Sequence, residues 1–300
     1  MASIFPIYDL ARRVAGPDAD VIELIPPEES PHMHRPSPHD MEMSTGANLA
    51  VLIGLDLDPW VQATMERVAP KARVLRLGDR VPTLPRDPSL ASQKQTTTGG
   101  APDNDPHAGD SIDPHVWLDP QRAMLMATAI AEELARVDSS HANAYRGRAL
   151  EVTQSLDALD HEIEARTQTW KQRSFVTLHD AFHYYATRYH LEVAASIQPS
   201  PGARVQLRYE QLVLRRLRER GANAIFGEPQ FDSQPARTLS QSAGLPYGVL
   251  DPLGGQPETQ SYEAMMRANT AALEAALAGP AVHSPGAQPS GAPSGAPSAN

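Results

Sequence analysis

The chain has 300 residues, of which 41% are hydrophobic and 21% are charged, and its formal net charge is −10. This length predicts two lobes of ordinary domain size, and the acidic balance argues against a nucleic-acid partner, which requires basic surface. The absence of cysteine excludes disulfide bonds, thiolate zinc sites and thiol nucleophiles, and no apolar run approaches the roughly 20 residues that cross a bilayer.

The first part of the chain alternates apolar runs with helical patterns, which predicts an α/β lobe with a parallel sheet. Strands are expected at residues 4–8, 21–25, 48–53 and 73–77. A helix over 9–15, stopped by Gly16, follows the first of these runs. In such a fold, ligand-binding groups lie on the loops at the ends of the strands.

A helix is predicted from Pro120 to about Val137, and a second, longer helix from about Ser139 to Lys171. The second helix has one apolar stripe with steps of three and four residues, formed by Tyr145, Ala149, Val152, Leu156, Leu159 and Ile163. At about 1.5 Å per residue it is long enough to connect two lobes.

The pattern of strands and helices then restarts, which predicts a second α/β lobe. Strands are expected at 175–178, 191–197, 224–227 and 245–250, and helices at 180–189 and 206–220. The predicted division is an N-terminal lobe (1–138) with a mobile insertion (84–112), a linking helix (139–173), a C-terminal lobe (174–279) and a disordered tail (280–300) rich in Pro, Gly, Ala and Ser.

Three histidines stand in short, rigid contexts: His32 within 30–36, His115 within 113–120 and His179 within 175–182. Neutral imidazole is the commonest protein ligand for zinc-like ions. Three imidazoles from separate segments can form a tetrahedral site whose fourth position is filled by a carboxylate or water. The sequence therefore predicts a metal-handling protein.

Six segments carry a family resemblance, and they occur in the family's order: 6–10, 30–40, 113–120, 175–185, 227–231 and 250–254. On these motifs, which spread over residues 3–277, the chain resembles the zinc-type (ZnuA/TroA-like, cluster A-I) solute-binding proteins of bacterial metal ABC importers. The resemblance implies two lobes joined by one long helix and a metal site in the cleft between them. It also implies delivery of the ion to an ABC permease with its ATPase subunit.

The family's ligand positions fall on His32, His115 and His179, and Asp251 matches the position of an aspartate or glutamate ligand in some relatives. Some close zinc-type relatives have a glutamate just before the first histidine, where this chain has Pro31. The fourth ligand therefore stays open between a carboxylate and water.

Further polar residues near these motifs are candidates for accessory roles. His34 and His39 are surface residues in one interpretation; in the other, they form an entry site for the metal or supply a substitute fourth ligand. His107 is expected to be a solvated loop residue. Asp180 is either a helix cap or a group that orients a ligand, and Glu228 either lines the cleft or supports a loop. Asp113 and Asp119 flank His115 and are able to orient its ring or to cap the next helix, with capping favoured for Asp119.

Three imidazoles and a carboxylate favour zinc, whereas manganese sites use more oxygen donors and manganese-type relatives tend to have glutamate where His179 stands. The alternatives are a manganese receptor, a zinc-buffering or adhesin role on the same fold, and a zinc hydrolase. An enzyme is not expected, because the segment His161-Glu162 lacks the second histidine of a metalloprotease helix and has Ala165 in its place.

The first residues lack the basic stretch and apolar core of a secretion signal, so we expect either a cytosolic protein or one whose leader has been removed. The resemblance implies a periplasmic or cell-envelope location. We expect a monomer.

Overall fold

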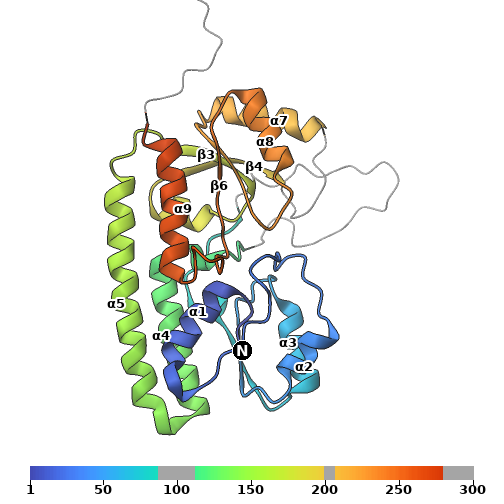
Figure 1. Ribbon diagram of the computed structural model, residues 1–300, viewed down its shortest axis with the longest axis vertical. Coiled ribbons are helices and arrows are strands. Elements are labelled where there is room, and N and C mark those ends of the chain that lie inside the picture. Colours follow the sequence, from blue (N-terminus) through green and yellow to red (C-terminus); the bar gives the residue numbers. More distant parts are fainter. Residues whose placement is uncertain (87–111, 199–206, 280–300) are drawn as a thin grey trace, which may run out of the picture.

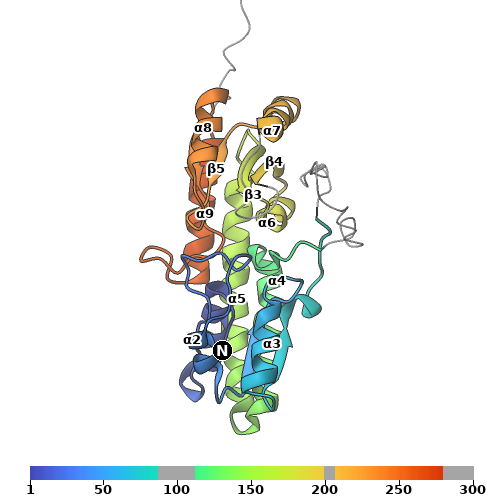
Figure 2. The same ribbon diagram turned by 90° about the vertical axis from the view of Figure 1, so that its right-hand side faces the viewer.

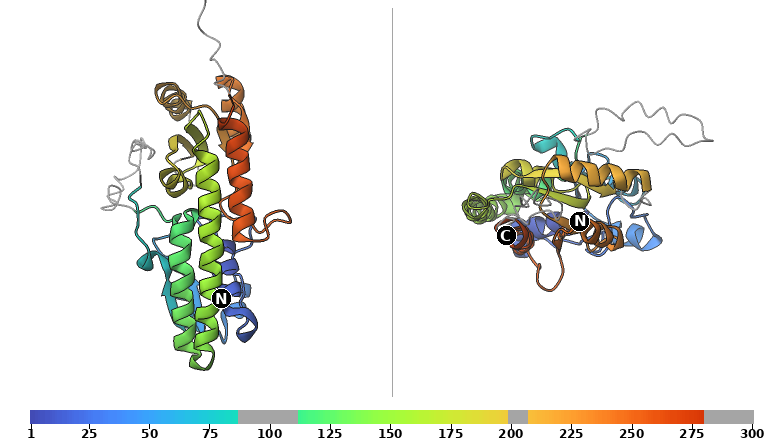
Figure 3. Two further views of the ribbon diagram at one scale, coloured as in Figure 1. Left: turned by 90° about the vertical axis from the view of Figure 1, so that its left-hand side faces the viewer. Right: turned by 90° about the horizontal axis from the view of Figure 1, so that it is seen from above.

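The computed structural model describes residues 1–86, 112–198 and 207–279, which form two α/β lobes connected along one side by a long helix. This helix, α5 (Ala142–Thr167), runs along both lobes in Figure 1. Its predicted apolar stripe is buried at every position. Helix α4 (Pro120–Val137) packs along the half of α5 next to the N-terminal lobe, and α9 (Tyr262–Leu277) along the other half (Figure 3).

The N-terminal lobe is built on strands β1 (Leu49–Leu52) and β2 (Arg73–Arg76), which pair in parallel. The chain start lies beside β1, where Ala2 forms parallel bridges to Val51 and Glu23. In the described part of the chain, this lobe also contains helices α1 (Phe5–Ala15), α2 (Pro38–Ser44) and α3 (Pro59–Val68).

The strand expected at residues 4–8 is wrong, because helix α1 already begins at Phe5. Pro6 fits the first turn of a helix, where no partner for its missing N–H is needed. The buried residues Ile7, Leu10 and Val14 follow helical spacing, which overrides the strand preference of the short apolar run. The strand expected at 21–25 is reduced to an isolated bridge at Glu23.

The C-terminal lobe has a four-stranded parallel sheet in the order β4-β3-β5-β6, which lies above the N-terminal lobe in Figure 2. Its strands match the predicted runs: β3 (Ser174–His179), β4 (Glu192–Gln198), β5 (Ile225–Gly227) and β6 (Tyr247–Val249). Its helices are α6 (His183–Arg188), α7 (Leu207–Glu219) and α8 (Gln234–Ala243). Helix α6 is shorter than the helix predicted at 180–189, because the chain turns after β3 before the helix begins.

One apolar core continues from the N-terminal lobe through α5 into the C-terminal lobe, joining Ile53, Leu159, Tyr185 and Leu253. A second core lies in the C-terminal lobe around Val176 and Ile225.

None of the helices in the described ranges is apolar over a length that would span a membrane. Most of the predicted insertion at 84–112 lies outside the described residues. The predicted tail at 280–300 and His107 lie entirely outside them. The domain boundaries stay predictions.

Candidate metal centre

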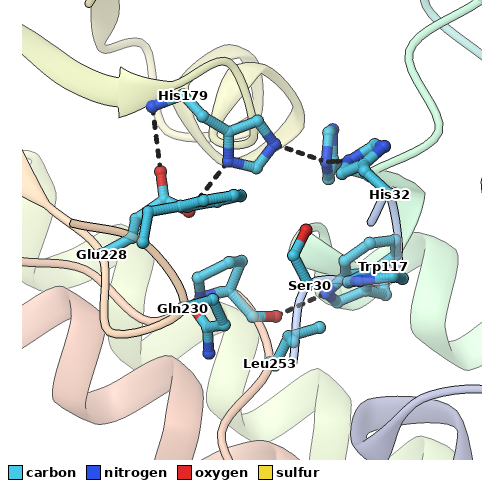
Figure 4. Close-up of a pocket in the computed structure, with 11 residues that line it drawn as sticks. Ser30, His32, Trp117, His179, Glu228, Gln230 and Leu253 are labelled. Carbon is cyan, nitrogen blue, oxygen red and sulfur yellow. Dashed lines mark hydrogen bonds and ion pairs between the residues drawn. The ribbon is translucent and has the colours of Figure 1, made fainter. Parts of the chain in front are cut away.

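His179 is the last residue of β3, so its side chain lies at the carboxyl edge of the sheet. Strand β5 pairs with β3, and Glu228 directly follows β5 at the same edge. The Glu228 carboxylate accepts hydrogen bonds from the His179 backbone N–H at 3.1 Å and from Nδ1 at 2.8 Å (Figure 4). Because an ionised carboxylate only accepts, this contact places the proton on Nδ1 and leaves the Nε2 lone pair available.

His115 is held in the same way, on the short 3₁₀ turn (Val116–Leu118) that leads into α4. Asp113 accepts from the His115 backbone N–H at 3.0 Å and from Nδ1 at 2.7 Å. Asp119 instead caps α4 by accepting from the backbone of Gln121 at 2.9 Å. The predicted cap at Asp119 is confirmed, and the orienting role belongs to Asp113.

His32 lies on an irregular loop before α2. The Ser30 carbonyl accepts from the backbone N–H groups of Met33 and His34, which closes the turn that carries His32. The ring of His34 lies against Trp60 with the ring centroids 4.7 Å apart. Its two nitrogens contact the carboxylates of Glu29, at 2.8 Å, and of Asp40, at 3.3 Å. These contacts tie the loop to the lobe.

The structure brings His32, His115 and His179 together where the two lobes meet. The Nε2 atom of His115 is 3.1 Å from the Nε2 atoms of both His32 and His179, and all three ligand atoms lie within 4.8 Å of one another. In the described residues this is the one group of three or more candidate metal ligands so close together. Lone pairs at these distances repel one another unless a cation or proton lies between them, so the arrangement favours a bound positive charge.

The three rings differ in proton affinity. Burial lowers the pKa of His32 and His115, and the positive charge of the neighbouring imidazoles lowers both further. Burial also acts to lower the pKa of His179, but the charge of Glu228 and its hydrogen bond outweigh burial and raise it. Two of the three imidazoles are therefore held neutral, which is the form that coordinates metal.

A small cavity of about 10 Å³ lies beside the three rings and has room for about one water molecule. It is lined by Ser30, Pro31, His32, His115, Trp117, His179, Glu228, Gln230, Phe231, Pro252 and Leu253. Most of this wall is apolar. This space is sufficient for a water molecule as the fourth ligand.

Asp251, expected as a fourth ligand, is not part of the histidine group. Its carboxylate accepts from the Gln230 side chain at 2.9 Å and from the Leu253 backbone at 3.0 Å, so it braces the loop after β6. The expectation that Asp251 joins the three histidines has no support in this geometry.

The accessory candidates divide between site and surface. Glu228 lines the cavity, whereas His39 is exposed on α2. Asp180 does not cap α6, whose N-cap is Phe182, and its buried Oδ1 has no hydrogen-bond partner among the described residues. Gln230 lies in the motif at 227–231 but was not singled out as a site residue, because that motif does not show that it lines the cavity.

The family model described as "ZnuA: Zinc-uptake complex component A periplasmic" matches residues 1–276. The chain belongs to this family. The zinc-binding protein AdcA of Streptococcus pyogenes serotype M1 is 27% identical over 280 residues, which cover 90% of this chain and 54% of AdcA. The high-affinity zinc uptake system protein ZnuA of Brucella abortus (strain 2308) is 35% identical over 144 residues, or 48% of this chain and 43% of that protein. The aligned region spans about half the length of these curated relatives.

Solved structures share the ZnuA-like fold. A crystal structure of ZnuA superposes with a TM-score of 0.77 at 23% identity, covering 92% of this chain and 97% of that one. The laminin-binding adhesin Lmb of Streptococcus agalactiae, solved as a mutant, gives 0.76 at 25% identity and covers 92% and 98%. The predicted architecture of two parallel-sheet lobes with one long connecting helix is confirmed.

Proposed function

We propose that this chain binds one divalent transition-metal ion, most favourably zinc, and delivers it to an ABC permease for import. The observation that carries the proposal is the convergence of His32, His115 and His179 on one point between the lobes. The zinc-uptake names of the family and of its matched relatives support the same cargo.

The ligand set supports zinc over manganese. The three converging atoms are imidazole nitrogens, which suit zinc, copper and nickel, whereas manganese prefers carboxylate, carbonyl and water oxygens. The carboxylates Asp113 and Glu228 bind the far ring nitrogens of His115 and His179 and so act as orienting groups. Carboxylate partners of this kind raise the basicity of ligating histidines and hold their rings in place.

The position of the site supports delivery to a partner that contacts both lobes. His32 and His115 belong to the N-terminal lobe and His179 to the C-terminal lobe, so a permease that touches both lobes is able to disturb the ligand set. We place the protein in the periplasm or cell envelope, where such importers collect their cargo.

A zinc hydrolase has the same kind of ligand set but also needs a general base facing the metal-bound water. Here the carboxylate of Glu228 is occupied by His179 through both oxygens, and the other side chains on the described cavity wall include no second carboxylate. We therefore propose a binding role without catalysis.

The experiment is calorimetric titration of the chelator-stripped protein with zinc and with manganese, on wild type, His115→Ala and His179→Ala. His161→Ala is the matched control, since this histidine is exposed on α5. We expect one tight zinc site that is lost or weakened at least about 100-fold in the two cavity variants and unchanged in the control. No saturable site in wild type, or equal losses in all three variants, would contradict the proposal.

A further inference from the structure

Ser30 is a polar residue on the cavity wall to which neither the sequence motifs nor the family assign a role. It is 6% exposed, and its backbone is fixed because its carbonyl accepts from both Met33 and His34. Figure 4 shows its hydroxyl pointing toward the histidine cluster. No hydrogen bond of this hydroxyl occurs within the described parts of the chain.

The other polar side chains on the wall are already engaged or enclosed. Glu228 is bound to His179 through both of its oxygens. The amide nitrogen of Gln230 donates to the Pro27 carbonyl at 3.0 Å and to Asp251 at 2.9 Å, and its carbonyl oxygen is buried without a hydrogen-bond partner in the described structure. Ser30 therefore presents a free hydroxyl on the described wall, and the Gln230 carbonyl oxygen is a second unpaired polar atom there, more deeply buried than the hydroxyl.

The donor set also leaves one position for such a ligand. Three neutral imidazoles satisfy three of the four positions of a tetrahedral zinc ion, and the cavity beside them holds about one water molecule. Asp251, the carboxylate expected there, is engaged with Gln230 and Leu253. A metal-bound water in an otherwise apolar cavity needs a hydrogen-bond partner, because an unpaired polar group is costly there.

We propose that Ser30 positions a water molecule as the fourth ligand of the bound ion, through a hydrogen bond between its hydroxyl and that water. This inference rests on the proposed metal-binding function and adds a specific role for one residue. The hydroxyl rotates freely, so it accepts from bound water and donates to bound hydroxide, and the charge-assisted bond to hydroxide is the stronger one.

The test uses the protein loaded with Co²⁺, whose visible absorption reports its coordination, in wild type, Ser30→Ala and Ser30→Thr. Ser242→Ala makes the same chemical change on exposed α8 and is the matched control. The spectrum of the saturated protein is followed from about pH 7 to 10, where metal-bound water loses a proton. Zinc affinity is measured in parallel by competition with a chelator.

We expect Ser30→Ala to raise the midpoint of the spectral change by about half to one pH unit and to weaken zinc binding about five- to tenfold. Ser30→Thr, which keeps the hydroxyl, should restore both values toward wild type, and Ser242→Ala should change neither. Circular dichroism verifies folding, and Ser30→Gly replaces the alanine variant if that variant does not fold.

A wild-type spectrum that does not change over this range, or a Ser30→Ala protein that titrates like wild type, would overturn the role of Ser30. Failure of the underlying function looks different. In that case wild type shows no saturable site for Co²⁺ or zinc, or shows one that survives His115→Ala.

Discussion

His115 and His179 sit on opposite sides of the site, one in each lobe, and receive the same support from a buried carboxylate. The Nδ1 of His115 lies 2.7 Å from Asp113, and the Nδ1 of His179 lies 2.8 Å from Glu228. Their pKa values nevertheless move in opposite directions, down for His115 and up for His179. The hydrogen bond alone therefore does not decide the charge state of the ring.

The difference comes from what surrounds each pair. Burial lowers the pKa of both rings, but Glu228 and then Asp180 surround His179 with negative charge. Besides the Asp113 carboxylate, the charges that act on His115 are those of His179 and Arg86, and both lower its pKa further. Burial also raises the pKa of Asp113 to about 6, which still leaves its carboxylate mostly ionised at neutral pH. The N-terminal lobe thus offers neutral imidazoles, and the C-terminal lobe offers a more basic one.

Among changes to the carboxylates that support the two histidines, the largest effect is expected for Glu228→Gln. This change keeps an oxygen that accepts from Nδ1 but removes the charge that makes His179 basic, so zinc affinity should fall about 10- to 100-fold. Chelator competition at about pH 7.5 measures it. Glu66→Gln, on the exposed face of α3, is the control and should have no effect. An unchanged affinity in Glu228→Gln would show that the contact is only structural.

Asp113→Asn should have a smaller effect, a loss of about tenfold or less. The asparagine oxygen still accepts from the His115 ring, and burial lowers the pKa of His115 despite the Asp113 carboxylate, whereas the Glu228 charge raises the pKa of His179. The same competition assay compares the two variants directly. If Asp113→Asn cost more affinity than Glu228→Gln, the asymmetry between the lobes would be refuted.

The third prediction concerns pH. A proton on His179 competes with the metal, and because its pKa is raised, protonation begins above the ordinary value of about 6.5 and increases as pH falls. His32 and His115, whose pKa values are lowered, stay neutral through this range. Apparent zinc affinity should therefore fall about tenfold per pH unit between about pH 6.5 and 5.5.

Calorimetry across this range gives the number of protons displaced per ion. Glu228→Gln should move the decline to lower pH, since it removes the main cause that raises the pKa of His179. A slope that corresponds to three protons, or an affinity independent of pH, would contradict the proposed charge states.

The smallest expected effect is on the stability of the fold and leaves metal binding unchanged. Asp160 on α5 is a buried carboxylate with fixed donors, and it accepts from Arg188 at 2.6 Å and from Tyr189 at 2.9 Å. Tyr189→Phe removes one of these hydrogen bonds and should lower the free energy of unfolding by about 1 kcal/mol without changing zinc affinity. Urea unfolding of the metal-free protein measures this change.

Tyr247→Phe is the matched control, because the buried hydroxyl of Tyr247 has no hydrogen-bond partner in the described structure. Its loss should leave stability unchanged or raise it slightly. Equal destabilisation by the two tyrosine variants would show that loss of packing, and not the bond to Asp160, is what is measured.

The long helices with a repeating apolar pattern could be predicted from the sequence, whereas the short elements at the start of the chain could not. The stripe on α5 repeats over many turns, so helical spacing is unambiguous there. Residues 4–8 form a run too short to distinguish strand from helix, and only the later spacing of Leu10 and Val14 indicates that the helix begins at Phe5.

At the site, the three histidines could be predicted because each stands in a recognisable motif, but their partners could not. Asp113 and Asp119 both flank His115, and the local sequence does not show which carboxylate reaches the ring. Glu228 contacts His179 across 49 positions of the chain because β5 pairs with β3, a pairing that becomes visible only in the folded sheet. Asp251 has a ligand's position in the motif, but in the folded chain its carboxylate accepts a hydrogen bond from Gln230, a contact that the sequence does not show.

The continuous helix α5 also has a kinetic consequence. About 39 Å long, it packs against α4 of one lobe and α9 of the other, so separating the lobes widely would require bending it or breaking those contacts. His179 ends a strand and His115 begins a helical turn, whereas His32 is carried by irregular chain. An ion bound between the lobes is therefore expected to leave through local rearrangement of the chain that carries its ligands, without a wide rotation of the lobes.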